Sequence, residues 1–334
     1  MKPAIFRIFA AAIACIFVLA SCATDDPGVT EPTSVPPGHQ GLQKLTKGSG
    51  GEVLAALNAQ LGTEGKHYRV LMMEYITAPA SGQFGTTIIA KNFGNKQLTE
   101  HWVPYDPNRR GDRDITYAVD KFDGVANGGL LLAQLEPAID NAMSTWNNQS
   151  CSTIPIMKVD AGGDDQGFVQ YLTGYGGSPA WLADITHAGW LPETFFDLFA
   201  PSGGTFIIGA TFTFIWVDAA TGDPTDMDRN GKDDVAFREI YYNNHFVWSV
   251  DGPAWNDVEI DVESIALHES GHGLSQAHFG MVFFDGNGTK SPTLQHLHFS
   301  PRAVMNAVYW ETQRELLGSD AGGHCSIWAS WPIN

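Results

Sequence analysis

The feature of this sequence that most restricts its fold is the stretch IDVESIALHESGHGLSQAHF, residues 260–279. It places His268 and His272 four residues apart, so on a helix their imidazoles share one face and can bind one metal ion. Glu269 lies beside them, where its carboxylate can hold a water molecule at the metal. A third histidine, His278, follows six positions later. In a chain with 11 histidines, H-E-x-x-H alone arises by chance on the order of once in a hundred cases. The stretch therefore predicts a metal site rather than a helix with unrelated surface histidines.

The residues before the first histidine predict the helix that this site requires. Val262, Ile265 and Ala266 recur at helical spacing and give the helix a buried face. Asp261 is a suitable N-cap, because its side chain can accept a hydrogen bond from the backbone of Ser264 three residues later.

The same helix is predicted to end near Leu274. Gly271, Gly273 and Ser275 lower helix propensity at this point. A chain that turns here can bring His278 back as a third nitrogen ligand. The fourth position then stays open for water, which distinguishes catalytic zinc sites from closed structural ones.

The overall composition excludes one class of partner. The chain has 334 residues, of which 43% are hydrophobic, enough for one large domain or two ordinary ones. Its formal net charge is −18, with 19 basic and 37 acidic residues. Because nucleic-acid binding needs clustered Lys and Arg, which the sequence lacks, nucleic acid is not an expected partner.

The N-terminus has the pattern of an export signal. Lys2 and Arg7 precede an apolar run over residues 8–19, which is too short for a permanent transmembrane helix. The run ends in Leu-Ala-Ser followed by Cys22, and this resembles the signal of bacterial lipoproteins, in which the cysteine is lipid-modified. An ordinary signal peptide with an incidental cysteine is the alternative.

The rest of the chain divides by composition. We expect a signal peptide over residues 1–21 and a disordered tether over 22–41, where Pro, Gly and Thr are frequent. Residues 42–104 predict a short helix and two strands, in an accessory domain or a pro-segment. The remaining residues, 105–334, are expected to form the domain that carries the metal motif, and Arg109-Arg110 is a candidate processing point.

Export changes the meaning of the four cysteines. Cys15 leaves with the signal peptide and Cys22 carries lipid, which leaves Cys151 and Cys325. In an oxidising compartment these two can form a disulfide, and two separate buried thiols are the alternative. No cysteine lies between the tether and residue 150, so a pro-segment that blocks zinc with a thiolate is not expected.

An acidic loop is a candidate calcium site. Asp226, Asp228, Asn230 and Asp234 occupy positions 1, 3, 5 and 9 of this loop, with Gly231 at position 6 for the sharp turn. Oxygen ligands at alternating positions suit a hard cation. Position 12 lacks the glutamate of an EF-hand, and a solvated acidic turn is the alternative.

Around the histidines the sequence resembles a known family. HESGHGLSQAH (268–278) looks like the metzincin signature H-E-x-x-H-x-x-G-x-x-H, and its flanks resemble the matrixin branch of those zinc endopeptidases. Further segments match in the same order: DITYAVD (114–120), LLLAQLEPAIDNAMSTWNN (130–148), ADI (183–185), EIYYNNHFVWS (239–249), RAVMNAVYW (302–310) and LLGSDAGGHCSIW (316–328). The resemblance covers roughly residues 105–330. It implies an α+β, zincin-like catalytic domain with a twisted, mixed five-stranded sheet and three main helices.

The resemblance also implies roles for residues outside the signature. Met305 would form the Met-turn beneath the zinc, and Tyr309 would wall the substrate pocket. An extended substrate would lie along an edge strand, for which residues 204–218 are the candidate. Two positions depart from the family pattern: Ser275 replaces a glycine that needs a positive φ, and Ala307 replaces a proline of the Met-turn.

Other histidines compete for a place in the site. His296 and His298 are alternative third ligands, but His278 has the position that the signature requires. His187 is expected to be structural.

The residues and the resemblance together predict a zinc-dependent endopeptidase. Zinc on three imidazoles would lower the pKa of its water toward about 7, and Glu269 would accept the proton of that water and pass it to the leaving amine. The expected partners are a protein or peptide substrate and the membrane, through the N-terminal lipid, for a monomer in the periplasm or at the cell surface. The alternative is a catalytically silent binding or adhesion lipoprotein on a metzincin scaffold.

Overall fold

Two long neighbouring strands lie at the centre of the fold. β7 (Ile207–Trp216) and β8 (Asp233–Asn243) are rich in β-branched and aromatic residues, which favour extended backbone. They pair antiparallel, and almost all of their residues are buried. Strands of this kind need cover on both faces of the sheet, and helices provide it.

The computed structural model describes residues 50–78, 87–88, 97–123, 126–252, 259–284 and 297–333. All of these belong to one compact unit, Val35–Asn334. The expected signal peptide, tether and lipidated Cys22 lie outside the described residues.

The main sheet is mixed and has the order β2-β1-β7-β8-β6-β4-β5, with β3 also paired to β8. Its other strands are β1 (Tyr68–Thr77), β2 (Thr87–Ile88), β3 (Glu100–His101), β4 (Ile115–Val119), β5 (Ile156–Lys158) and β6 (Ile185–Leu191). The pairs that join β5, β4, β6 and β8 are parallel, whereas β8–β7, β7–β1 and β1–β2 are antiparallel.

The expected α+β class with a mixed sheet is confirmed, and residues 105–334 contribute the expected five strands to a described sheet of eight. β7, β8, β6, β4 and β5 make up five strands, and β1 and β2 extend the sheet beyond β7 while β3 joins β8. The additional strands come from the segment before residue 105, whose strands were not expected in this sheet.

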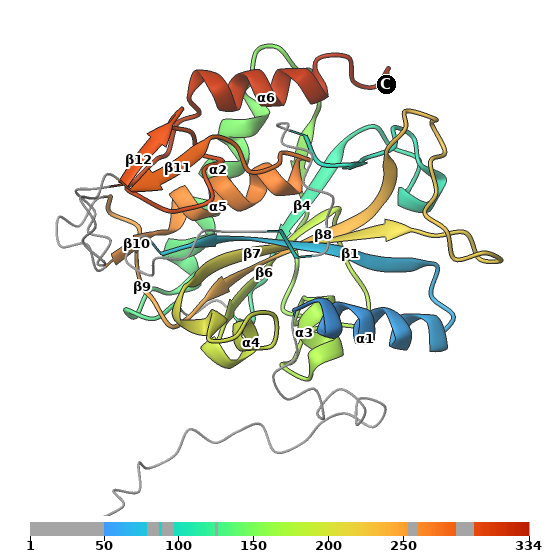
Figure 1. Cartoon of the computed structure of the whole chain (residues 1–334), viewed down its shortest axis with the longest axis horizontal. Helices are drawn as coiled ribbons and strands as arrows, with labels where there is room; N and C mark the ends of the chain where they lie inside the picture. The colour runs from blue at the N-terminus through green and yellow to red at the C-terminus, as the bar shows by residue number, and fades with distance from the viewer. Residues whose placement is uncertain are drawn as a thin grey trace, which may run out of the picture. The chain divides into compact units, whose positions relative to one another are not determined.

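Helices cover both faces of the sheet (Figure 1). One face carries α2 (Leu132–Asn147), α5 (Val262–Gly273) and α6 (Gly318–Trp328), and the other carries α1 (Gly50–Thr63), α3 (Phe168–Thr173) and α4 (Glu193–Asp197). Each face has its own hydrophobic core. α1 is a fourth long helix beside the three that were expected, and it packs on β1.

Short elements complete the described chain. β9 (Val247–Ser249) and β10 (Glu259–Asp261) pair parallel just before α5, and β11 (Met281–Phe284) and β12 (Leu297–Ser300) pair antiparallel after it. Two 3₁₀ turns are η3 (Pro107–Arg109) and η4 (Gly203–Thr205). Among the described helices, none is long and apolar enough to cross a bilayer.

α2 and α6 are joined covalently as well as by packing. The predicted apolar face of α2 is buried, with Leu135, Ala138, Ile139, Ala142 and Trp146 all in the core beneath α5. Cys151, just after α2, forms a disulfide with Cys325 of α6. The two leftover cysteines are therefore paired in the structure.

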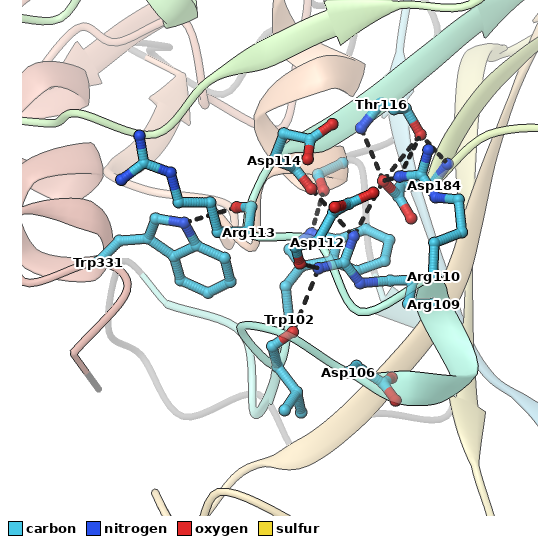
Figure 2. Close-up of polar contacts among 12 residues, drawn as sticks. Trp102, Asp106, Arg109, Arg110, Asp112, Arg113, Asp114, Thr116, Asp184 and Trp331 are labelled. Carbon is cyan, nitrogen blue, oxygen red and sulfur yellow. Dashed lines mark hydrogen bonds and ion pairs between the residues drawn. The ribbon is translucent and has the colours of Figure 1, made fainter.

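Arg109 is buried at the start of the expected catalytic domain (Figure 2). Its guanidinium lies 3.0 Å from the Asp184 carboxylate and donates to the carbonyl oxygens of Val103 and Asp114. Arg110 reaches the same carboxylate at 3.2 Å. A protease needs an exposed, extended chain, so a bond between the buried Arg109 and an arginine paired with Asp184 is a poor processing point.

Candidate metal centre

The helix that carries the metal motif begins and ends where the sequence predicts. The Asp261 side chain accepts a hydrogen bond from the Ser264 backbone at 2.9 Å, and α5 ends at Gly273, with Leu274 as its C-cap. Every residue of this helix is buried. Its lack of a polar face follows from its position between the sheet and α2.

Three imidazole nitrogens converge at the C-terminal end of α5. Nε2 of His272 lies 3.1 Å from Nε2 of His268 and 3.2 Å from Nε2 of His278. His268 and His272 are buried, while His278 is partly exposed after the turn. The structure thus brings together the three residues that the sequence selected as ligands.

The chemistry of these nitrogens fits zinc. Donor atoms placed tetrahedrally at about 2.0–2.1 Å from zinc lie about 3.3 Å apart, close to the observed Nε2 separations. Burial lowers the pKa of His272 to about 3 and those of His268 and His278 well below the ordinary value, so all three imidazoles are neutral at pH 7. Three neutral nitrogens that point at one another repel unless a cation lies between them.

The outer nitrogens of two ligands have acceptors that fix the tautomer. Nδ1 of His268 lies 2.7 Å from the carbonyl oxygen of Val304, and Nδ1 of His272 lies 2.8 Å from that of Gln276. A proton on each Nδ1 leaves the lone pair on Nε2, which faces the other histidines. The Glu74 carboxylate also lies 2.8 Å from Nδ1 of His272.

Glu269 lies between α5 and β7, fully buried. Its Oε2 accepts a hydrogen bond of 2.6 Å from the Thr211 hydroxyl, and Oε1 has no hydrogen-bond partner of ordinary geometry. Gly209 leaves room for the carboxylate, since a Cβ there would lie 3.0 Å from Oε1. Burial raises the pKa of Glu269 well above its usual value.

The turn from α5 to His278 has the backbone that the signature requires. Ser275 adopts a φ of 65°, so this residue takes the positive φ expected at that position. Its hydroxyl accepts a hydrogen bond of 2.9 Å from the buried guanidinium of Arg238, which also donates to the carbonyl of Gly273 at 2.9 Å. The serine hydroxyl thus binds Arg238, which glycine could not do because it has no side chain.

Met305 lies directly beneath the helix of the ligands. A Cβ on Gly271 would lie 2.3 Å from the Met305 sulfur, so only glycine fits at this position of α5. The Asp320 carboxylate of α6 accepts hydrogen bonds from the backbones of Val304 and Met305, at 3.0 and 3.2 Å. The turn is therefore held from both sides, without the proline that Ala307 replaces.

Tyr309 contacts the start of α5 and the end of β1, and the strand expected at the open edge of the site lies inside the sheet. The Tyr309 hydroxyl accepts a bond of 3.3 Å from the Asp261 backbone, and burial raises its pKa to about 12. Residues 204–218 contain β7, which has β8 on one side and β1 on the other. The prediction that β7 is an edge strand is wrong in this structure.

Of the competing histidines, His187 does not join the three ligands, and the side chain of His298 lies outside the described part of the chain. His187 is buried on β6, with Nδ1 2.7 Å from the Tyr242 hydroxyl and its pKa lowered by burial to about 3. His298 lies on β12, opposite Phe283 of β11. His296 falls outside the described residues.

The acidic loop brings its carboxylates together. Ligand oxygens of Asp226, Asp228 and Asp234 lie within 4.8 Å of one another, and Gly231 has a φ of 80°. The side-chain amide of Asn230 donates to Asp228 at 3.1 Å, so it acts here as a hydrogen-bond donor. Asp226 accepts from the backbones of Asn230 and Gly231. These bonds also suit a turn without an ion, and calcium stays a prediction.

Sequence reasoning missed several residues around the site. Glu74 of β1 contacts the ligand His272, and Arg238 of β8 contacts the turn after α5. Asp320 of α6 contacts the Met-turn. A second acidic group of Asp120, Asp123 and Asp165 was also missed. None of these residues lies in a local motif. The one available signal was Arg238 within an apolar strand, since a buried charge needs partners.

No protein-family model matches the chain, and no curated protein matches it. Fold and site define a mixed α+β protein with three convergent histidines and a buried glutamate beside them. What the site does has to be argued from its geometry.

Proposed function

We propose that this protein is a zinc-dependent endopeptidase of the metzincin type, with a matrixin-like catalytic domain. The observation that carries the proposal is the convergence of three neutral imidazole nitrogens beside a buried carboxylate. His268, His272 and His278 would hold the metal, and Glu269 is the base. Three protein ligands leave one position for water or substrate, which favours a catalytic over a structural site.

Glu269 carries the proton chemistry in this proposal. Zinc, when bound, polarises the scissile carbonyl and acidifies water. The Glu269 carboxylate takes the proton of the attacking water and returns it to the leaving amine. Thr211 holds Oε2 in place at 2.6 Å and leaves Oε1 available for that proton. Peptide hydrolysis needs these two transfers and no covalent intermediate.

Three further proposals accompany this function. The Pro-rich tether and Cys22 support an exported, lipid-anchored protein, acting as a monomer in the periplasm or at the cell surface. The loop of Asp226, Asp228 and Asp234 supports a structural calcium ion. Mass measurement of the mature N-terminus tests lipidation, and calcium titration followed by loop-specific hydrogen exchange tests the ion.

A silent binding protein on the same scaffold is the second candidate. It is favoured by one observation: β1 pairs with the side of β7 that faces away from β8 and contacts His272 through Glu74, so the metal centre is covered. The two candidates differ in the role of Glu269, because only an enzyme needs it.

Peptide cleavage by the zinc-loaded protein separates the two candidates. A diverse peptide mixture is incubated with the wild type and with Glu269→Ala, and products are identified by mass spectrometry. The enzyme predicts cleavage that falls by about 10²–10⁴-fold in the variant while zinc stays bound. A measurable cleavage rate that is equal in both proteins, with one zinc per chain, would favour the binding protein.

A further inference from the structure

β1 occupies the side of β7 that an extended peptide would need. It pairs antiparallel with β7 from Tyr68 opposite Trp216 to Thr77 opposite Ile207. In Figure 1, β1 crosses the sheet beside β7, below α5. The backbone groups of β7 that face away from β8 are thus already paired, and β-augmentation by a second chain is blocked.

The C-terminal end of β1 reaches the groups that would perform the chemistry. The Glu74 carboxylate lies 2.8 Å from Nδ1 of His272. The backbone N–H of Ile76 faces the Glu269 carboxylate. β1 therefore contacts the ligand His272 through Glu74 and the base Glu269 through Ile76, two residues further along the strand.

The segment after Met305 encloses the same end of β1 from its other side. The Thr77 backbone donates to the carbonyl of Ala307 at 3.4 Å and accepts from the Tyr309 backbone at 3.0 Å. Thr77 forms a parallel bridge with Val308 there. β1 thus lies as an extended chain between β7 and the segment that carries Tyr309.

This arrangement leaves no room for a second extended chain at the site. Glu74 and Thr77 are buried, as are His268, His272 and Glu269. A polypeptide substrate needs its backbone beside β7 and its scissile bond at the histidines. Both places are taken by residues of β1.

α1 and β1 are held to each other by contacts of their own. The Asn58 side chain of α1 donates to and accepts from the backbone of Val70, both at 2.8 Å. Leu54, Leu57 and Leu61 of α1 are buried in the same core as β1. These local contacts do not depend on the histidines.

We propose that α1 and β1 form a built-in inhibitory segment, with β1 bound in the cleft as an extended chain, and that β1 must be released before a polypeptide can be cleaved. This inference rests on the proposed function. Inhibition here works by occupying the peptide path, whereas a thiolate switch would need a cysteine, which residues 50–78 lack.

The test weakens β1 without changing a metal ligand or the base. Ile76→Pro removes the N–H that faces Glu269 and disrupts strand pairing, since proline is poorly tolerated inside a sheet. The matched control is Met157→Pro on the short edge strand β5, where Met157 is exposed. Both full-length proteins, loaded with zinc, are compared with the wild type for cleavage of the peptide mixture. Hydrogen exchange reports whether β1 has detached from β7.

Release of β1 predicts that Ile76→Pro cleaves at least about tenfold faster than the wild type, because each ~1.4 kcal/mol lost from pairing increases the open population tenfold. Met157→Pro should match the wild type. Suppose that β1 is detached in Ile76→Pro but the wild type cleaves equally fast, in a reaction that needs Glu269. The inhibitory role of β1 is then overturned, and the peptidase proposal stands. If zinc is bound and β1 detached but nothing is cleaved, the peptidase proposal fails as well.

A second variant decides the matter if the proline variant does not fold. A recognition sequence for a site-specific protease is inserted between residues 80 and 81, and the folded, zinc-loaded protein is cut there. The Glu269-dependent rate should rise with the fraction cut, and added N-terminal fragment should lower it again. The inference is overturned if removal of the cut N-terminal fragment does not change the rate and if adding the fragment back does not change it either.

Discussion

Two opposing effects meet at Ser275. A positive φ costs a non-glycine residue about 1–2 kcal/mol. The hydroxyl in return accepts from the buried Arg238, and Nδ1 of His101 lies 3.2 Å away. A hydrogen bond to a charged group contributes about 1.5–3 kcal/mol. The hydrogen bonds are therefore expected to outweigh the strain.

We predict that Ser275→Gly destabilises the zinc-free protein by about 1 kcal/mol, although it relieves the positive φ. Ser275→Ala keeps the strain and loses the hydroxyl, so it should be less stable than Ser275→Gly. Urea unfolding of the three proteins measures these differences. A glycine variant more stable than the wild type would show that Arg238 contributes little here.

Asp123 makes the stability depend on pH. Burial, followed by the charge of Asp165, raises its pKa from 3.8 to about 7. Because the folded pKa is the higher one, the folded state binds the proton more tightly, and stability is lost as the pH rises from about 4 to 7.

We predict that Asp123→Asn gains stability over the wild type as the pH rises, from almost nothing at pH 4 to about 1–2 kcal/mol at pH 8. The figure is reduced from 1.36 kcal/mol per pH unit because the group is partly exposed. Urea unfolding between pH 4 and 8, with a chelator present, measures the gain. A gain that does not change with pH would contradict the raised pKa.

At the scale of elements, α5 depends on its fit to the Met-turn. A Cβ on Gly271 would meet the Met305 sulfur at 2.3 Å and Trp146 at 3.0 Å, whereas a Cβ on Gly273 would lie 3.1 Å from Ile185. Overpacking a core costs about 1–3 kcal/mol. Gly271 is therefore expected to tolerate an added methyl group less well than Gly273.

We expect Gly271→Ala to lose about 2–3 kcal/mol of stability and to bind zinc more weakly, because Met305 must move beneath the ligands. Gly273→Ala serves as the matched control and should lose clearly less. Thermal unfolding and zinc competition with a chelator measure both variants. Equal losses would mean that the Met-turn does not support α5.

The elements differ in how far the sequence could predict them. α5 has a cap at Asp261, a face of apolar residues and glycines at its end, all within the single stretch 261–273. The ligands follow from that local pattern. The place of β1 depends on pairing with β7, more than 130 residues further along the chain, as in Glu74 opposite Thr211. No local pattern encodes such a partner, so the sheet was expected to end at β7.

The same limit applies to the supports of the site. Arg238 reaches Ser275 from β8, and Asp320 reaches Met305 from α6. Each contact depends on how distant elements pack. The five strands β7, β8, β6, β4 and β5 match the number that the family resemblance implied for residues 105–334.

At the scale of the whole molecule, one covalent link closes a long loop. The Cys151–Cys325 disulfide joins positions 174 residues apart, and α5 lies inside this loop. Constraining the unfolded chain over so long a loop stabilises a protein by about 2–5 kcal/mol. We predict a loss of that size for Cys151→Ala combined with Cys325→Ala, with the zinc site still formed at low temperature. Thermal unfolding with zinc quantification measures it, and an unchanged melting temperature would contradict the link's role.

The account as a whole rests on Glu269 acting as a base at a zinc site that β1 covers. The most direct test compares Ile76→Pro with Ile76→Pro/Glu269→Ala, both loaded with zinc, by mass-spectrometric profiling of the same peptide mixture. The account predicts many cleaved peptides from the first protein and a loss of about 10²–10⁴-fold in rate from the second. One zinc per chain, detached β1 and no cleavage from either protein would contradict it and leave a metal-binding protein without peptidase activity.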